Sequence, residues 1–244
     1  MDDQAQLIDI GGRRLFAQVQ GSGPGVVLMS GACAAGVGGW DSADSHLAQV
    51  ATVVTYDRAG TGRSDPPLSA PSATDMVQDL HLLLLALRLT LPVVLVGRSL
   101  GALPAQLYAC EYPAEVKGVV LLDPTPDLML TNYYAPAPKA SHRSDTSSGH
   151  LERQRIAESC AQVRRAIEEE GRMPNVPVVV VTAADRSDMG TERVIGDPLL
   201  LAYQHMVARV PQGRLVVAER SSHKTLISSD CDLIISTVRS IISH

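Results

Sequence analysis

A serine flanked by two glycines is the strongest chemical signal in the sequence. The stretch reads Gly-Arg-Ser-Leu-Gly-Ala, with Ser99 between Gly97 and Gly101. An apolar run at 92–96 precedes it and predicts a buried strand, and a helical pattern over 99–111 follows it. A sharp strand-to-helix turn needs small residues on both sides of the serine, because backbone there packs against backbone. The pattern predicts a nucleophile elbow that raises the Ser99 hydroxyl above a sheet.

A serine hydroxyl is a weak nucleophile and needs a neighbouring base. His223 follows the strand-like run 214–218, where a base can reach the end of a sheet. His205 lies within a helical pattern, and His244 is the last residue of the sequence. We therefore expect His223 to be the base that takes the proton from Ser99.

Three aspartates are candidates for the acid that orients the histidine. Asp185 follows the valine-rich run 176–181, and catalytic groups collect at the carboxyl ends of strands in open α/β sheets. Asp185 is therefore the favoured acid. Asp188 lies three residues further on, and Asp123 ends another strand-like run at 119–122, so both remain alternatives.

Short β-rich runs alternate with longer helical patterns along the chain. Such alternation predicts a parallel sheet with helices on both faces. The strand-like runs lie at 15–20, 26–29, 52–56, 92–96, 119–122, 176–181 and 214–218, and the helical patterns at 73–89, 99–111, 151–170, 199–210 and 232–242.

One segment interrupts this alternation. Residues 124–150 contain prolines, two adjacent tyrosines and a long polar run, but no clear strand. A structureless insert of this length in a compact domain is often a lid. We expect a single domain over residues 1–244, with residues 124–175 as a short cap or lid insertion.

Composition excludes several classes of protein. The 244 residues carry a formal net charge of −5 without a basic block, so nucleic acid is not an expected partner. The longest apolar run, at 82–87, is far shorter than the roughly 20 residues of a membrane-spanning helix. The acidic N-terminus lacks an apolar signal core, so we expect a cytoplasmic protein without a membrane partner.

Cysteine usage and the balance of cations add two further expectations. The four cysteines are scattered without Cys-x-x-Cys spacing, which favours free thiols over a disulfide framework or a metal site. Cys33 is expected to be a small packing residue rather than a nucleophile. Arginine greatly outnumbers lysine, which suggests a GC-rich bacterial genome.

Taken together, the motifs resemble those of the α/β-hydrolase superfamily, in its serine-nucleophile branch, over nearly the whole chain. The resemblance implies a mostly parallel eight-stranded sheet, a lid after the sixth strand and no cofactor. It also puts Ser99, Asp185 and His223 in the positions of the catalytic triad. The segments that carry it are Gly31 after the run 26–30, the stretch 57–64 (Asp-Arg-Ala-Gly-Thr-Gly-Arg-Ser), residues 97–101 and the pair 222–223.

The same resemblance implies an oxyanion hole built from two backbone N–H groups. One is that of Leu100, directly after the nucleophile. The other comes from the loop after the run 26–29, where many relatives have His-Gly and the next residue is the donor. This chain has Ser-Gly there, followed by Ala32, so Ala32 is the expected second donor.

These residues predict hydrolysis of a small-molecule ester, thioester or other acyl substrate through an acyl-enzyme. Two alternatives remain open. The chain could be a thioesterase or acyltransferase of a bacterial biosynthetic pathway, in which another acceptor replaces water, or a receptor-like member that binds a ligand. The expected substrate-contacting side chains are Arg98, Trp40, Tyr133 and Tyr134.

Overall fold

In the computed structural model, which describes residues 5–32, 34–127, 155–172, 175–185, 187–189 and 198–243, eight strands form one sheet. Their order is β1-β2-β4-β3-β5-β6-β7-β8. The pairs β1/β2 and β2/β4 are antiparallel and all other pairs are parallel. This confirms the expected mostly parallel eight-stranded sheet. The strands are β1 (Gln6–Asp9), β2 (Arg14–Gly21), β3 (Gly25–Met29), β4 (Thr52–Tyr56), β5 (Val93–Arg98), β6 (Val116–Leu122), β7 (Val178–Asp185) and β8 (Gly213–Ser222).

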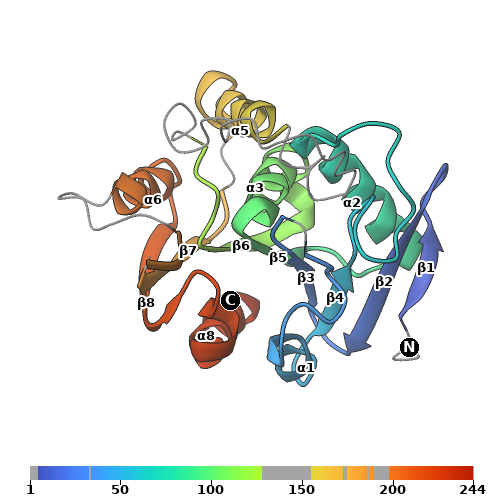
Figure 1. The fold of residues 1–244 in the computed structure, drawn as a ribbon, viewed down its shortest axis with the longest axis horizontal. Coiled ribbons are helices and arrows are strands. Elements are labelled where there is room, and N and C mark those ends of the chain that lie inside the picture. Colours follow the sequence, from blue (N-terminus) through green and yellow to red (C-terminus); the bar gives the residue numbers. More distant parts are fainter. Residues whose placement is uncertain are drawn as a thin grey trace, which may run out of the picture.

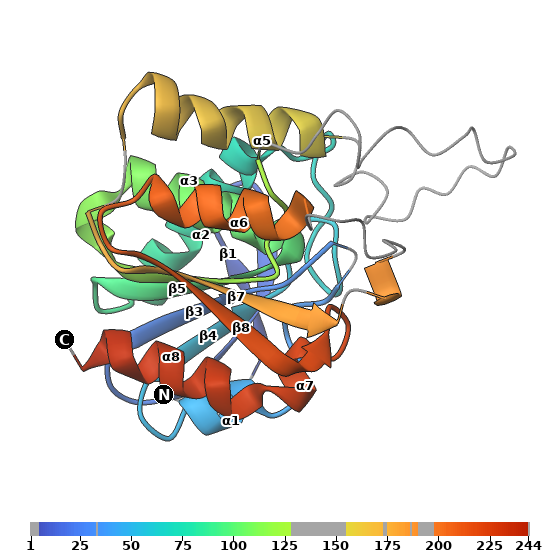
Figure 2. The ribbon, with the colours of Figure 1, turned by 90° about the vertical axis from the view of Figure 1, so that its left-hand side faces the viewer.

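Helices cover both faces of the sheet (Figures 1 and 2). On one face, α2, α3 and α6 pack into one apolar cluster, and α5 lies outside α2 and α3. On the other face, α1, α7 and α8 pack into a second cluster. The helices are α1 (Ala43–Leu47), α2 (Ala73–Leu87), α3 (Ala102–Glu111), α5 (Ile156–Arg164), α6 (Pro198–Ala208), α7 (Leu226–Ser229) and α8 (Cys231–Ile242).

The two layers of helices explain the composition of the central strands. Every residue of β3 and β4 is buried, and β5 is buried up to its last residue, Arg98. A strand covered on both faces has no solvent side, so its sequence is continuously apolar rather than alternating. Short helical turns complete the described structure at Ser99–Gly101, Pro113–Glu115 and Ser187–Met189, with a π turn at Arg165–Glu169.

The described residues near the end of the segment 124–175 pack against α2 and α3. The helix expected over 151–170 is found as α5 and the π turn that continues it. Helix α2 begins at a capping box, in which Ser72 and Asp75 each satisfy a backbone N–H of the other. The next N–H of α2, that of Ala73, donates to the hydroxyl of Ser159 on α5 at 2.9 Å. Helix α5 therefore supplies a partner that the end of α2 would otherwise lack.

The carboxyl ends of the parallel strands share one edge of the sheet, as the arrowhead of β7 indicates in Figure 2. The segments that follow β3, β5, β6, β7 and β8 all begin at this edge. Within the part of the chain that the structure describes, no helix has the length and apolar character needed to cross a membrane.

Candidate active site

Ser99 lies in a strained turn at the end of β5. Its φ of 50° is in the left-handed region, which a residue with a side chain adopts at a cost. A Cβ on Gly97 would lie 2.6 Å from the carbonyl oxygen of Gly101, and a Cβ on Gly101 would lie 2.3 Å from that of Met29. These contacts are with backbone, which cannot move aside, so only glycine fits at both positions. The backbone has the form expected of a nucleophile elbow.

The loop after β3 lies directly against this serine. A Cβ on Gly31 would be 3.3 Å from the Cβ of Ser99 and 3.9 Å from its Oγ. The buried Arg58 donates from Nη1 to the carbonyl oxygen of Ser30 at 2.6 Å and from Nη2 to that of Gly31 at 2.9 Å. Two fixed carbonyls determine the course of the backbone that leads into Ala32. The segment carrying this expected oxyanion donor is therefore held beside Ser99.

Asp57 organises the loops around that segment. Its Oδ1 accepts the N–H groups of Gly36 at 2.6 Å and Val37 at 3.0 Å, and its Oδ2 accepts that of Arg63 at 3.0 Å. A Cβ on Gly62 would lie 2.0 Å from Oδ2, so glycine is required there. Neither this carboxylate nor the arginine after it was expected to have a role of its own. The available signal was a charged pair placed directly after a fully buried strand.

His223 follows β8 and approaches a buried carboxylate. Its Nδ1 lies 3.3 Å from Oδ2 of Asp123, which is only 4% exposed. The other carboxylate oxygen, Oδ1, accepts the hydroxyl of Thr182 at 2.9 Å and the N–H of Ala183 at 3.0 Å. One oxygen of Asp123 is thus fixed by two donors on β7, which leaves the second oxygen facing the imidazole.

The structure brings Asp123, rather than the favoured Asp185, to the histidine. Asp185 is exposed at the end of β7, and its Oδ1 accepts the N–H of Ser187 at 2.9 Å. Strands β6 and β7 are neighbours that end at the same edge, so a carboxylate from either can reach the loop after β8. Sequence position alone does not separate these two placements.

Asp188, the third candidate, contacts the loop around the histidine. Its Oδ2 accepts the hydroxyl of Ser222 at 2.6 Å and the N–H of Lys224 at 2.8 Å. Burial acts to raise the pKa of this carboxyl, but the two hydrogen bonds, the charge of His223 and that of Lys224 outweigh it. The pKa of Asp188 is therefore lowered from its ordinary value.

Ser99 and His223 lie at the same edge of the sheet, and one side chain links the segments that carry them. Arg98, the neighbour of Ser99, donates from Nη2 to the carbonyl oxygen of His223 at 3.0 Å. Among the described residues, no hydrogen bond joins Ser99 Oγ to His223. Catalytic hydrogen bonds of this kind often become short only when substrate is bound.

Of the four side chains expected to contact substrate, the structure describes two. The Arg98 guanidinium is bonded to the carbonyl of His223 and is only half-exposed. Trp40 is 1% exposed and belongs to the apolar cluster of the α1/α8 face, so among the described residues it packs in the core, and its contact with substrate stays a prediction. Its ring fills the core, as large apolar rings usually do. Tyr133 and Tyr134 lie outside the described residues.

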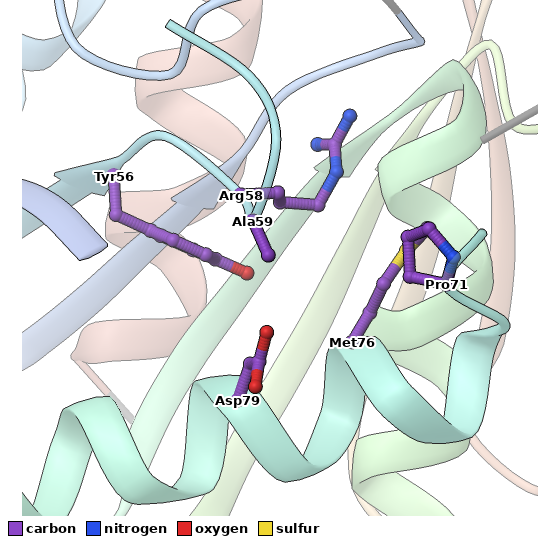
Figure 3. A pocket seen from close by; sticks show the side chains of 6 residues that line it. All are labelled: Tyr56, Arg58, Ala59, Pro71, Met76 and Asp79. Carbon is purple, nitrogen blue, oxygen red and sulfur yellow. The ribbon is translucent and has the colours of Figure 1, made fainter. Parts of the chain in front are cut away.

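A small hollow lies on the other side of Arg58 (Figure 3). The oxygen atoms of Tyr56 and Asp79 point into it, whereas the Arg58 guanidinium turns away from both. Burial raises the pKa of the Asp79 carboxyl, and the nearby Arg13 opposes this effect. The hollow therefore lies on the side of Arg58 opposite to its guanidinium, and it is separate from the loop that this guanidinium holds beside Ser99. It is lined by Tyr56, Arg58, Ala59, Pro71, Met76 and Asp79.

The described cysteines do not offer a competing nucleophile. Cys110 and Cys160 are buried free thiols, and burial raises the pKa of each to about 12. Both thiols are therefore protonated near neutrality and unreactive. Cys231 is half-buried, and burial raises the pKa of its thiol as well. Cys33 lies outside the described residues.

The sequence of this chain is similar to a known protein family and to several known proteins. Residues 24–168 match the family model described as alpha/beta hydrolase fold. The chain is 27% identical over 209 residues to the 2-(acetamidomethylene)succinate hydrolase of Mesorhizobium japonicum, a match that covers 86% of this chain and 69% of that protein. It is 30% identical over 136 residues to the protein YqjL of Bacillus subtilis, covering 56% of this chain and 53% of that one. The chain thus spans only about half the length of the Bacillus relative.

Solved structures share the fold. A serine hydrolase involved in carbazole degradation superposes with a TM-score of 0.69 at 17% identity, covering 98% of both chains. The thioesterase domain from the curacin biosynthetic pathway has a TM-score of 0.69 at 17% identity, covering 97% of this chain and 98% of that one. At these identities the likeness concerns the arrangement of the backbone.

Proposed function

Because the chain belongs to the α/β-hydrolase fold family, we propose that it is a serine hydrolase that cleaves an ester or related acyl bond of a small-to-medium organic substrate. The observation that carries the proposal is the strained turn at Ser99, where a left-handed serine is retained between two glycines that admit no side chain. Strained residues of this kind cluster at active sites, where the surrounding structure holds them in place. A 2-(acetamidomethylene)succinate hydrolase among the relatives supports a small substrate.

In the proposed mechanism, Ser99 Oγ attacks the acyl carbon while His223 accepts its proton at Nε2. Asp123 accepts a hydrogen bond from the Nδ1–H group, which selects the tautomer with a free Nε2 and stabilises the imidazolium that forms. The carbonyl oxygen becomes an oxyanion facing the N–H groups of Leu100 and Ala32. Each such donor typically lowers the barrier by ~3–4 kcal/mol.

Collapse of this intermediate breaks the bond to the leaving group, which departs with the proton from the imidazolium. The acyl group is then an ester of Ser99. A water molecule gives a proton to His223 and attacks the same carbon, and the second intermediate releases the acid and regenerates the serine. The carboxylate of Asp123 remains ionised throughout and acts on the orientation and charge of the ring.

Asp123 is the proposed acid because two hydrogen bonds fix the orientation of its carboxylate. Two donors hold Oδ1, from Thr182 and Ala183, so rotation of the carboxylate away from His223 would break both hydrogen bonds. Asp185 is exposed at the end of β7, whereas Asp123 is only 4% exposed. A fixed acid aligns a general base better than a solvated one.

Turnover of a series of p-nitrophenyl esters with short to medium acyl chains tests the proposal. We expect hydrolysis by the native protein and a loss of at least about 10⁴-fold in kcat for Ser99→Ala, which cannot form the acyl-enzyme. Equal turnover by this variant would refute it. Product analysis with added thiol and amine acceptors separates hydrolysis from acyl transfer, since only transfer forms the acceptor adduct.

A further inference from the structure

The loop that carries His223 is held from two sides. On one side, Arg98 Nη2 donates to the carbonyl oxygens of His223 at 3.0 Å and Lys224 at 3.4 Å. On the other side, Asp188 Oδ2 accepts the hydroxyl of Ser222 at 2.6 Å and the N–H of Lys224 at 2.8 Å. Donor and acceptor groups of the same short segment are thus bound by two charged side chains. The backbone on both sides of the imidazole is fixed.

Arg98 also connects this loop to the nucleophile. It is the last residue of β5 and directly precedes Ser99, whereas His223 is 125 positions further along the chain. A displacement of the arginine side chain would therefore change the separation of the two reacting groups. A misplacement of about 1 Å can reduce turnover by about 10²-fold.

The charges around Arg98 favour this role over capture of an anionic substrate. Burial lowers the pKa of its guanidinium, and the carboxylates of Asp123, Asp41 and Asp188 oppose that effect. The negative charges of these three carboxylates reduce the positive potential that a substrate carboxylate would meet at Arg98. A single nitrogen, Nη2, donates to both carbonyl oxygens of the loop.

We propose that Arg98 and Asp188 are positioning residues, which hold the loop bearing His223 at the place where its imidazole can take the proton of Ser99. The inference rests on the proposed serine-hydrolase function. It assigns to Arg98 a contact with the base in place of the expected contact with substrate.

Two buried polar atoms support a functional reason for this arrangement. Within the described residues, Arg98 Nε and Asp188 Oδ1 have no hydrogen-bond partner. Natural proteins keep few such atoms, because each one sacrifices a hydrogen bond to water without replacement. Both atoms belong to the two side chains that hold the loop bearing His223.

The experiment measures inactivation by a small fluorophosphonate, whose phosphorus is attacked by Ser99 Oγ as the bond to fluoride breaks and the serine proton passes to His223. The rate constant kinact and the binding constant KI are determined separately for the native protein, Arg98→Met, Arg98→Lys and Asp188→Asn. Arg14→Met is the matched control, because Arg14 pairs with Asp65 on an exposed part of β2. Melting temperature and circular dichroism establish that each variant is folded.

We expect kinact to fall about 10²-fold in Arg98→Met, with KI within twofold of the native value. Addition of millimolar guanidinium to Arg98→Met should restore part of kinact. The variant Arg98→Lys should keep a kinact between those of Arg98→Met and the native protein. For Asp188→Asn we expect a fall of about tenfold, because the amide oxygen can still accept both hydrogen bonds but without the charge of the carboxylate. Arg14→Met should leave both constants unchanged. If Arg98→Met does not fold, Arg98→Lys and Asp188→Asn carry the test.

A kinact within threefold of the native value in all folded variants overturns the inference. A change confined to KI also overturns it and returns Arg98 to a substrate-binding role. If the native protein itself is not modified at Ser99, the proposed function fails instead, so the two failures are distinguishable.

Discussion

The turn at Ser99 and the loop at His223 are built by different physical means. At Ser99, steric contacts between backbone atoms determine the conformation, and Gly97 and Gly101 are required because a Cβ would overlap carbonyl oxygens. At His223, hydrogen bonds from distant side chains determine it, through Asp123, Arg98 and Asp188. Backbone constraints leave a fixed spacing of small residues in the sequence. Side-chain networks leave no such spacing.

This difference implies different sensitivities. Substitution at the turn should affect folding and activity together, because the backbone itself must move. Substitution around the histidine should reduce turnover while the fold persists, because only one side chain loses its orientation. The following variants test that separation, from the largest expected effect to the smallest.

The largest effect should come from the acid. Asp123→Asn should lower kcat about 10⁴-fold, because an amide facing His223 Nδ1 favours the wrong tautomer. The matched variant Asp185→Asn should keep kcat within about threefold. Steady-state kinetics on one ester, with melting temperatures for both proteins, makes the comparison. The reverse ranking would show that Asp185 is the acid.

The next effect should come from the turn. In Gly101→Ala the new Cβ would lie 2.3 Å from the carbonyl oxygen of Met29 and 2.6 Å from that of Ser30. We expect a destabilisation of ~3 kcal/mol and a melting temperature lower by about 6–12 °C. Calorimetry against the control Gly11→Asn, at a left-handed glycine with open space, measures it. Equal stability of the two variants would contradict the steric account.

A smaller effect is expected from the residue that holds the acid. Thr182→Val removes the hydroxyl that donates to Asp123 Oδ1 and keeps the shape of the side chain. We expect kcat to fall about tenfold with an unchanged KM, the equivalent of one hydrogen bond to a carboxylate. Thr237→Val, whose hydroxyl bonds a carbonyl within α8, is the control. An effect on KM alone would assign Thr182 to substrate binding.

The smallest effect should depend on pH. The folded-state pKa of Asp188 is lowered by its hydrogen bonds, so its contribution to stability is present above the ordinary value of 3.8 and is lost as the pH falls below it. The native protein should therefore melt slightly above Asp188→Asn at pH 7, and this difference should shrink as the pH falls below 3.8 and through the lowered folded-state pKa. A difference that grows on acidification would give the shift the opposite sign.

Much of the fold follows from periodicity. The seven strands after β1, the long helix α2 and the turn at Ser99 lie where apolar runs and small residues predict them. The elements that periodicity does not predict are short. Strand β1 has four residues and helix α1 has five, which is too few for a repeating pattern of burial to be distinguished.

The site was less predictable for a specific reason. Asp123 and Asp185 end neighbouring strands, so both satisfy any rule based on sequence position. What distinguishes the two aspartates is Thr182 on β7, whose hydroxyl donates a hydrogen bond to the carboxylate of Asp123 at the end of the neighbouring strand β6. Trp40 illustrates the same limit, because its burial depends on how the loop after β3 folds against the core. Such contacts are tertiary and have no local signature.

The central claim is that Ser99 is activated by His223. The most direct measurement is mass mapping of peptides after incubation with a fluorophosphonate, for the native protein and for His223→Ala. We predict a single phosphonate adduct on Ser99 in the native protein and its near-complete loss in His223→Ala under the same conditions. An adduct on another residue, or equal labelling of Ser99 in both proteins, would contradict the account.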